Sequence, residues 1–403
     1  MHHQLAKRRV VVAVRSIASQ TQSAAPNRFS SSTCHRTMSQ GTPLLPPENV
    51  RPTPIRGPFK TAKSLIEFFS TNERKRDPPG PNKTKHIRLI TVGISHYCEK
   101  VRWALDLLES DPSNPYYYTE DAHPPALQAI ATNEASNGQA SMTPMVVYTD
   151  DETSAGNHKK VLCDSQGILL ELCPFLYPPS IKKEVVELES YLGLHLGATI
   201  RCFLYFYLLE KQNHNILIKM ANSNTSTIES ILFEKMLGNG IADGMKKAMK
   251  INKESAQQSL ESIRKTFSQL SNKLAIPGNG DVRKRDYLMD TDDKSHGLTS
   301  ADLTLCALAA PLLAPPETEA ISIHYDKLIP NEILDLKKEL LKTLAGQHVL
   351  GIYRQHRLKQ ISTNQNSKKP YLKVVNRNRL PVGVHMSVAA GTAICCLSIL
   401  SKI

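Results

Sequence analysis

The spacing of hydrophobic residues changes near Pro178 and Pro179. Upstream of these prolines, short runs rich in β-branched residues, which are typical of strands, alternate with stretches of helical spacing. The runs predict strands at 86–93, 116–119, 145–149 and 161–163, and the helical stretches predict helices at 95–109, 124–131 and 165–176. The order is therefore βαβαββα over residues 86–177, which predicts a small α/β domain.

The residues after Pro179 follow a helical spacing instead. Leu188, Leu192 and Leu196 lie on one stripe of a long helix that we predict over 181–212. Further helices are predicted at 227–236, 255–274, 302–313 and 331–353. No strand is expected in this part, and two polar stretches, 211–226 and 277–296, are interpreted as surface insertions. Residues 180–355 are therefore expected to form an all-helical bundle.

The net charge of +13 is carried by the two ends of the chain. Residues 1–47 contain six lysines and arginines and no acid, and residues 340–403 contain ten and no acid. Residues 48–339 are consequently close to neutral, which argues against a basic groove for nucleic acid and favours targeting or anionic surfaces as the reason for the basic ends. A chain of 403 residues, 40% of them hydrophobic, is long enough for two or three folded domains.

Residues 1–47 have the profile of an organelle targeting segment, because they are rich in arginine and serine and lack acids. This interpretation predicts import into a mitochondrion or a plastid. A basic tail without a targeting role is the alternative, and Met38 as a downstream start would remove the segment. Residues 48–85, which are rich in proline and charge, are interpreted as a linker.

The last residues, 356–403, form a basic tail that ends in an uncharged stretch. Residues 382–401 contain no Lys, Arg, Asp or Glu and are long enough to span a bilayer. Basic residues before this stretch would put the folded domains on the cytosolic face of that membrane. Small and polar residues make its insertion marginal, so a C-terminal membrane anchor and a loose or packed segment both remain open.

The eight cysteines are scattered along the chain and form no C-x-x-C pair. This distribution supports neither a disulfide framework nor a zinc site, and it fits a reducing compartment. No metal is expected.

Four sequence motifs occur at junctions between predicted elements. The first is SHYCEKVRWAL at 95–105, where a predicted strand meets a predicted helix. The others are MTPMV at 142–146, VLCDSQGIL at 161–169 and LTSADL at 298–303. In the last motif, Thr299 and Asp302 have the spacing of a capping box, with Leu298 and Leu303 as its hydrophobic staple.

In this order and spacing the motifs resemble the serine-type cytosolic glutathione transferases, over about residues 86–355. The resemblance implies a thioredoxin-like domain at 86–177, whose element order matches the βαβαββα pattern, followed by a helical substrate domain at 180–355. It implies glutathione as the co-substrate and a dimer as the common assembly. It also implies that the peptide bond before Pro144 is cis, a form that is essentially confined to proline.

Ser95 lies six residues before Val101, where the serine-type transferases keep the catalytic hydroxyl. The thiol of glutathione has a pKa of about 8.5, so little of the nucleophilic thiolate exists at neutral pH. A hydroxyl that donates to the sulfur favours the thiolate, and the positive end of a helix dipole adds to this effect. The alternative is that Ser95 only caps the helix, which is a common role for serine.

The resemblance assigns glutathione binding to residues of two further motifs. The backbone of Thr143, turned outward by Pro144, would pair with the peptide like an added strand. Asp164 and Ser165 would hold the γ-glutamyl group at a second helix N-terminus, where backbone N–H groups suit a carboxylate; capping that helix is the alternative. Gln139 precedes the proline turn and would reach the glycyl end of glutathione.

Other residues near the first motif have competing interpretations. Cys98 is either a second thiol of the site or a small buried residue, since the motif resembles a glutaredoxin C-x-x-C that has lost its first cysteine. His96 is interpreted as a solvated residue at the helix end, and Tyr97 as a packing residue. Arg201 and Tyr205, on the long helix, would line the electrophile pocket; an ion pair within the bundle is the alternative for Arg201.

Three functions are compatible with these residues. The first is a glutathione transferase that conjugates glutathione to a hydrophobic electrophile in detoxification. The second is a non-catalytic scaffold of the same fold, which the basic ends and the insertions favour. The third is a thiol–disulfide reductase or isomerase, which would have to use Cys98 alone. The set of Ser95, Thr143–Pro144 and Asp164–Ser165 favours the transferase, because a scaffold has no need of all three.

Overall fold

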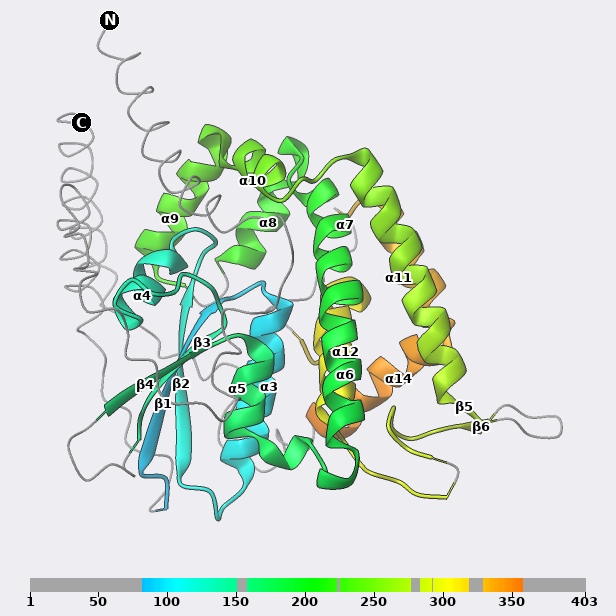
Figure 1. Cartoon of the computed structure of the whole chain (residues 1–403). Helices are drawn as coiled ribbons and strands as arrows, with labels where there is room; N and C mark the ends of the chain where they lie inside the picture. The colour runs from blue at the N-terminus through cyan, green and yellow to red at the C-terminus, as the bar shows by residue number, and fades with distance from the viewer. Residues whose placement is uncertain are drawn as a thin grey trace, which may run out of the picture. The chain divides into compact units, whose positions relative to one another are not determined.

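The computed structural model describes residues 82–150, 158–222, 225–276, 283–291, 293–318 and 329–357, which belong to one compact unit (Figure 1). The expected targeting segment at 1–47, nearly all of the linker and of the basic tail, and the candidate span at 382–401 lie outside these residues. Within them, no single helix has the length and apolarity to cross a bilayer, although one bent pair, Pro179–Leu208 with Lys211–Ala221, meets both criteria jointly.

A four-stranded mixed sheet forms the first half of the described chain. Its spatial order is β2-β1-β3-β4. β1 is parallel to β2 and antiparallel to β3, and β3 is antiparallel to β4. The strands are β1 (Lys85–Val92), β2 (Tyr116–His123), β3 (Met145–Asp150) and β4 (His158–Cys163), and the helices between and after them are α3 (His96–Ser110), α4 (Gln128–Ala135) and α5 (Ser165–Leu172).

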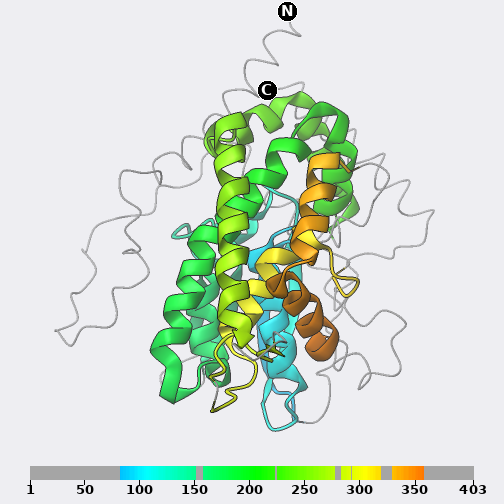
Figure 2. The same ribbon diagram turned by 90° about the vertical axis from the view of Figure 1, so that its right-hand side faces the viewer.

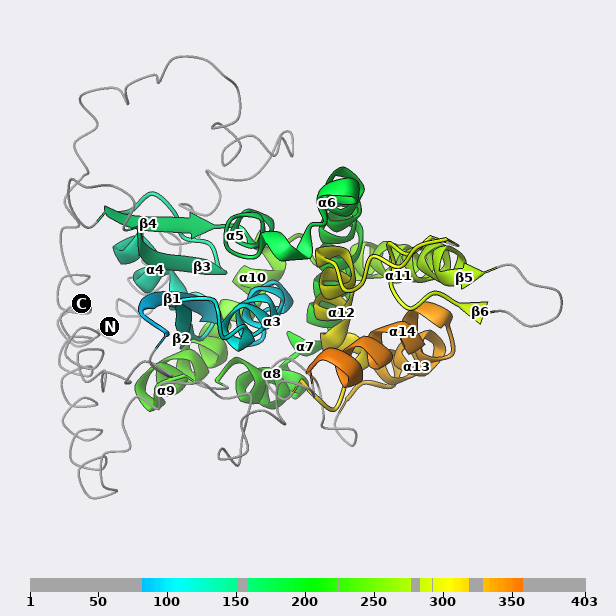
Figure 3. The same ribbon diagram turned by 90° about the horizontal axis from the view of Figure 1, so that it is seen from below.

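Helices cover both faces of this sheet. Figure 3 shows α4 on one side of the strands and α3 and α5 on the other. The alternation of side chains along a strand explains this: Ile90 and Met145 pack with α4, whereas Leu89 and Val146 belong to the large core on the side of α3. Both faces of the central strands β1 and β3 are therefore largely buried, which is why these two strands read as apolar runs.

The predicted order βαβαββα is confirmed, with shifted boundaries. β2 extends to His123, four residues beyond the prediction, and α4 begins at Gln128 rather than at 124. The strand order and the helical half that follows give the chain the predicted fold class, a thioredoxin-like domain followed by a helical bundle.

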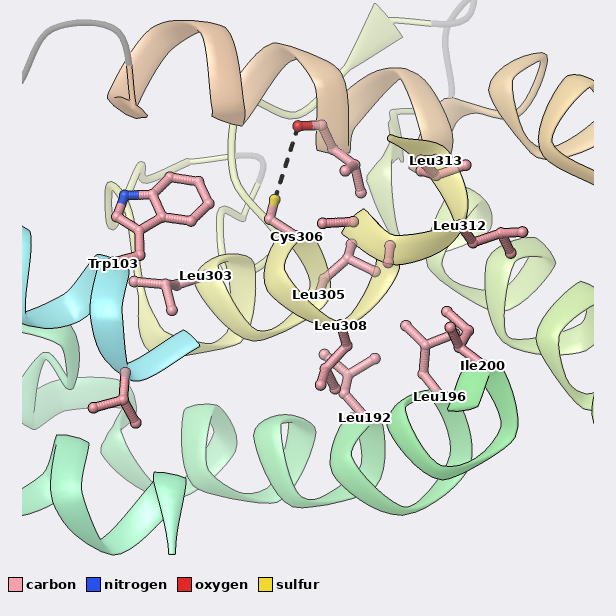
Figure 4. Packing of buried hydrophobic residues seen from close by; sticks show 14 of the residues in the cluster. Trp103, Leu192, Leu196, Ile200, Leu303, Leu305, Cys306, Leu308, Leu312 and Leu313 are labelled. Carbon is pink, nitrogen blue, oxygen red and sulfur yellow. Dashed lines mark hydrogen bonds between the residues drawn. The ribbon is translucent and has the colours of Figure 1, made fainter. Parts of the chain in front are cut away.

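The helical half is built around α12 (Ser300–Leu313), all of whose residues are buried. In Figure 4, Leu192, Leu196 and Ile200 approach α12 from one side, while the thiol of Cys306 faces the Val349 carbonyl on another helix. The other helices are α6 (Lys182–Leu192), α7 (Ala198–Leu208), α8 (His214–Ala221), α9 (Thr227–Met236), α10 (Ala242–Ala248), α11 (Lys253–Leu274), α13 (Asn331–Leu341) and α14 (Leu344–Ile352). Among them, α7 and α11 run side by side (Figure 2).

The expected capping box starts α12. Thr299 is the N-cap, and the Asp302 carboxylate accepts hydrogen bonds from the Thr299 backbone N–H at 3.2 Å and hydroxyl at 2.8 Å. The second oxygen of Asp302 accepts from the Leu288 backbone N–H at 2.8 Å and lies 3.1 Å from Nε2 of His348. The motif thus joins the start of α12 to two other segments of the core.

Three expectations for the helical half are wrong. The stretch 211–226 is no polar insertion, because α8 buries an apolar face made of Ile216, Leu217, Met220 and Ala221. In the second polar stretch, 277–296, Leu288 and Met289 are buried, whereas the other described side chains are exposed or half-buried. Two short strands do occur, β5 (Ala275–Ile276) and β6 (Arg283–Lys284), but they pair only with each other. The helix predicted at 331–353 is divided into α13 and α14 because the Lys342–Thr343 segment leaves the helical path to cap α14.

A buried network of ion pairs connects the end of the helical half to α3. The Arg357 guanidinium donates to Glu99 at 2.9 Å and to Asp106 at 2.5 Å. Glu99 also accepts from Arg102, which in turn donates to Glu120 of β2 at 2.6 and 2.9 Å. Arg357 lies 5.3 Å from the ring centroid of Trp103, which packs against Tyr353. The network thus joins α3 and the neighbouring β2 to the end of the helical half, with 258 positions between Glu99 and Arg357.

A second set of contacts between the helical half and α3 lies at the N-terminal end of α3. The long helix expected at 181–212 contains a π-helical turn, Gly193–Gly197, between α6 and α7. The Tyr97 hydroxyl donates to the Gly193 carbonyl at 2.8 Å. A Cβ atom on Gly197 would lie only 2.3 Å from the Tyr97 hydroxyl oxygen, so glycine is required for this close approach.

Replacing Gly197 by alanine is therefore expected to lower the free energy of unfolding by about 1–3 kcal/mol, the typical cost of overpacking. Gly193→Ala is the matched control, because a Cβ there has no neighbour within 4 Å. Alanine is the better helix former, so this control should gain about 0.5–1 kcal/mol. Urea denaturation of both variants measures the difference. Equal stabilities would contradict the packing of Tyr97 on Gly197.

Candidate functional site

Segments from three parts of the chain meet at one end of the sheet. The strand register aligns Ile90 of β1 with Met145 of β3, and Met145 with Cys163 of β4. The predicted glutathione-site residues adjoin these positions: Ser95 follows β1, Thr143 and Pro144 precede β3, and Asp164 and Ser165 follow β4. Antiparallel pairing thus brings together three motifs that are separated by up to seventy residues.

Ser95 is the N-cap of α3. Its backbone is extended, with φ −77° and ψ 119°, and its hydroxyl oxygen accepts a hydrogen bond from the Cys98 backbone N–H at 3.4 Å. The side chain is half-buried. A serine hydroxyl that accepts one bond still has its proton to donate, and the first backbone N–H groups of a helix have no intrahelical partner. The capping role therefore does not compete with hydrogen bonding to an anionic sulfur.

The peptide bond between Thr143 and Pro144 is cis, as the resemblance implied. Thr143 is half-buried and Pro144 is buried. Gln139 lies on the loop between α4 and β3, where its side chain is exposed. The structure thus leaves the Thr143 side of this turn accessible, with Gln139 nearby in the sequence.

Asp164 has an unusual backbone conformation. Its φ of 100° and ψ of 124° lie in a region that residues other than glycine rarely adopt. Its exposed carboxylate caps α5 by accepting from the Gly167 backbone N–H at 3.2 Å. Conformations of this kind cost about 1–3 kcal/mol and cluster at functional sites. The strain at Asp164 is therefore an independent indication of a ligand site at this edge.

The Ser165 side chain is less accessible to a ligand than its place in the sequence predicted. The side chain is buried, and its hydroxyl accepts from the Lys100 ammonium group at 3.4 Å. Lys100 forms a buried ion pair with Glu189, which also accepts from the Tyr177 hydroxyl at 2.8 Å. Ser300 donates to Tyr177 at 3.0 Å. Ser165 thus ends a polar chain that crosses from α3 through α6 to α12, a chain that no local sequence signal indicates.

Cys98 is fully buried behind Ser95. Burial raises the pKa of its thiol, and hydrogen bonds with Ser95 and the Val92 backbone oppose this effect only in part. A buried thiol with a raised pKa lacks the thiolate character of a reactive cysteine. The structure therefore favours the packing role for Cys98 over the role of a second thiol.

His96 differs from the sequence expectation, because it is buried rather than solvated. Burial and, to a smaller extent, the charge of Arg201 lower the pKa of His96 to about 3, against the opposing effect of a hydrogen bond with the Gly197 backbone. Its ring lies 4.5 Å from the ring of Tyr97, measured between centroids, and its Nε2 atom has no hydrogen-bond partner. The reason for the burial is that the π-helical turn packs directly over the start of α3.

Arg201 and Tyr205 follow this turn on α7. Arg201 is exposed and forms no ion pair or side-chain hydrogen bond with any residue that the structure describes, so the expected alternative of an ion pair in the bundle is wrong. Its charge lowers the pKa of Tyr97, which burial and the charge of Asp164 raise. Arg201 and Asp164 therefore both lie within electrostatic reach of the Tyr97 side chain at the start of α3.

A buried histidine that no sequence pattern indicated joins β2 to α9 at the same end of the sheet. The Nδ1 atom of His123 lies 2.6 Å from Glu229, and Nε2 lies 3.0 Å from Asp121, which is also paired with Arg88. Burial lowers the pKa of His123, but Asp121 and Glu229 raise it more, to about 9. His123 is therefore an imidazolium held between two carboxylates.

The stability of the protein should depend on this histidine between pH 6.5 and 9. Its folded pKa exceeds the ordinary 6.5, so its contribution is complete below pH 6.5 and is lost as the pH rises to about 9. The loss amounts to about 3 kcal/mol. Urea denaturation across this range should show a steeper decline for the wild type than for His123→Gln. Equal slopes would contradict the assignment.

Comparisons with known proteins complete the description. No protein-family model and no curated protein matches the chain. Among solved structures, the chain is similar to a possible glutathione S-transferase from Rhodopseudomonas palustris, with 16% identity, a TM-score of 0.37, and 67% of this chain and 94% of that chain covered. The glutathione S-transferase of Ceriporiopsis subvermispora, solved in complex with glutathione, has 14% identity and a TM-score of 0.41, with 68% and 97% covered.

A third structure, the glutathione transferase YghU from Streptococcus pneumoniae complexed with glutathione, has 12% identity and a TM-score of 0.37, with 74% and 85% covered. These similarities are too remote to assign an activity or a residue. The fold is assigned from the strand order, and the site from the side chains described above.

Proposed function

We propose that the protein is a glutathione transferase in which Ser95 activates the thiol of glutathione. The observation that carries the proposal is the meeting of three elements at one end of the sheet: a half-buried serine hydroxyl at the start of α3, the turn at Thr143, and a strained aspartate at the start of α5. Strain at Asp164 is costly to keep without a function, which favours a ligand at this edge.

The reaction requires a thiolate and an electrophilic carbon. Glutathione loses its thiol proton to solvent, and the Ser95 hydroxyl donates a hydrogen bond to the sulfur anion, which lowers the pKa of the thiol. A charged acceptor makes the stronger hydrogen bond, so the hydroxyl prefers this sulfur to the neutral Cys98 thiol. The thiolate then attacks the carbon, a thioether bond forms, and the leaving group departs with its bonding electrons.

The same proposal assigns the binding of glutathione. The Thr143 backbone pairs with the peptide as an added strand would. The backbone N–H groups at the start of α5 hold the γ-glutamyl carboxylate, and Asp164 holds its amino group. Ser165 contributes through its backbone, since its hydroxyl is engaged by Lys100. Gln139 is assigned to the glycyl end.

A non-catalytic scaffold is the second candidate, and the engagement of Ser165 favours it, because a buried hydroxyl is not offered to a ligand. Two measurements on the full chain separate the candidates: calorimetric titration with glutathione, and turnover of glutathione with 1-chloro-2,4-dinitrobenzene. We expect saturable binding and formation of the dinitrophenyl conjugate. The scaffold predicts that glutathione is not bound, and binding without turnover would refute the enzymatic proposal alone.

The proposals on substrate class, assembly and localisation rest on the sequence. We propose a role in detoxification with a hydrophobic electrophile, and assembly as a homodimer. The profile of residues 1–47 supports import into a mitochondrion or a plastid, and the stretch 382–401 supports membrane contact as the alternative. A fluorescent protein fused to residues 1–47 tests the first of these localisations.

A further inference from the structure

Four residues spaced by four along the helix that carries the π-helical turn face the start of α3. Gly193 accepts from the Tyr97 hydroxyl, and Gly197 contacts the same side chain. Arg201 and Tyr205 continue this spacing on α7. Residues four apart lie on one side of a helix, so Arg201 and Tyr205 extend the surface that borders the N-terminus of α3.

Two side chains of this surface, Arg201 and Tyr205, lack polar partners among the residues that the structure describes. Arg201 is exposed and forms no ion pair in the described ranges, whereas Arg102, Arg357 and Arg264 are each paired with carboxylates. The Tyr205 hydroxyl likewise forms no hydrogen bond with any described residue, although the ring packs against the core.

A third polar group without a partner is the Nε2 atom of His96, on a side chain that is 5% exposed. A buried nitrogen of this kind is costly unless a ligand or water satisfies it. In either tautomer of the ring, Nε2 can form a hydrogen bond with an incoming polar group. His96 follows Ser95 at the start of α3, interacts with the Gly197 backbone and lies within electrostatic reach of Arg201, so it borders the same surface.

We propose that Arg201, assisted by the Tyr205 hydroxyl, binds an anionic group of the electrophile, so that the preferred substrates are carboxylate-bearing electrophiles. This inference rests on the proposed function and specifies its substrate class. A guanidinium suits a carboxylate because its planar fork donates two parallel hydrogen bonds. Glutathione also carries carboxylates, so the shared chemistry has two sources that the experiment must separate.

The test uses binding to the full-length chain by calorimetry and does not depend on turnover. The probes are S-benzylglutathione and S-(4-carboxybenzyl)glutathione, which differ by one carboxylate on the electrophile-derived part. We expect Arg201→Gln to weaken binding of the carboxylated conjugate about tenfold to a hundredfold and to leave the neutral conjugate unchanged. Arg264→Gln removes an equal charge from a surface pair with Glu339 and should change neither affinity.

The other outcomes overturn the inference in distinguishable ways. Equal weakening of both conjugates by Arg201→Gln would mean that Arg201 holds glutathione itself. No change for either conjugate would mean that Arg201 is a solvated surface residue. Failure of both conjugates to bind the wild-type chain would refute the proposed function and, with it, this inference.

Discussion

Replacing Arg357 by alanine is expected to lower the free energy of unfolding by about 3–5 kcal/mol, as is typical when one member of a buried ion pair is removed. The guanidinium is 2% exposed and donates to Glu99 at 2.9 Å and to Asp106 at 2.5 Å. Its removal leaves Asp106 without its arginine and leaves Glu99 with Arg102 alone. The carboxylates that lose this partner are largely buried, so water cannot solvate their charges at low cost.

Arg264→Ala is the control for this variant. Arg264 forms a bidentate pair with Glu339 of similar geometry, but both side chains are nearly half exposed. Surface pairs contribute about 0–1 kcal/mol, so the control should unfold close to the wild type. Urea denaturation followed by circular dichroism measures both variants. A loss for Arg357→Ala no larger than that of the control would refute the buried network.

Replacing Ser95 by alanine is expected to lower kcat with 1-chloro-2,4-dinitrobenzene about a hundredfold, the typical cost of removing one preorganised donor to an anion. The affinity for glutathione should hardly change, since binding is assigned to Thr143 and the start of α5. The pH dependence of the rate should shift upward, because the thiol loses the hydrogen bond that lowers its pKa. Ser95→Thr should restore the rate, because it retains the hydroxyl.

The Ser95 variant also loses a helix cap, so its stability must be measured alongside its activity. A lost cap costs about 1 kcal/mol. Thr343→Ala removes a comparable cap from α14, where Thr343 accepts from the Gly346 backbone N–H at 3.0 Å, and it should lower stability without lowering kcat. Cys98→Ala should also keep most of the activity. If Cys98→Ala abolishes turnover and Ser95→Ala does not, the protein uses cysteine-dependent thiol transfer instead.

The sheet and the capping box could be predicted because their signals are local. The short β-branched runs indicated each strand, and the Thr299–Asp302 capping box indicated the start of α12, which was predicted at 302 and is observed at Ser300. The helix α8 was missed because its four buried residues stand among asparagines and other polar residues, which made the stretch read as a surface connection. The π-helical turn was missed because the apolar residues around it, Leu188, Leu192, Leu196 and Ile200, are four apart and also fit one stripe of an ordinary helix.

The site was predictable in part for the same reason. Ser95, Thr143 and Asp164 lie at the ends of strands, where the strand order alone decides that they meet. Contacts across the two halves had no such signal. Lys100 and Glu189 are separated by 89 residues, His123 and Glu229 by 106, and Glu99 and Arg357 by 258. In the sequence, each of these six residues resembles an ordinary surface charge, so only the structure shows which of them form pairs.

The packing of Trp103 between α3 and the end of the helical half has a spectroscopic consequence. Trp103 is the only tryptophan in the chain, it is fully buried, and its indole lies against Tyr353 and Arg357. Its fluorescence is therefore a reporter of this junction alone. Separation of the two halves would expose the indole and move its emission to longer wavelength, even where the sheet and the helices keep their circular dichroism.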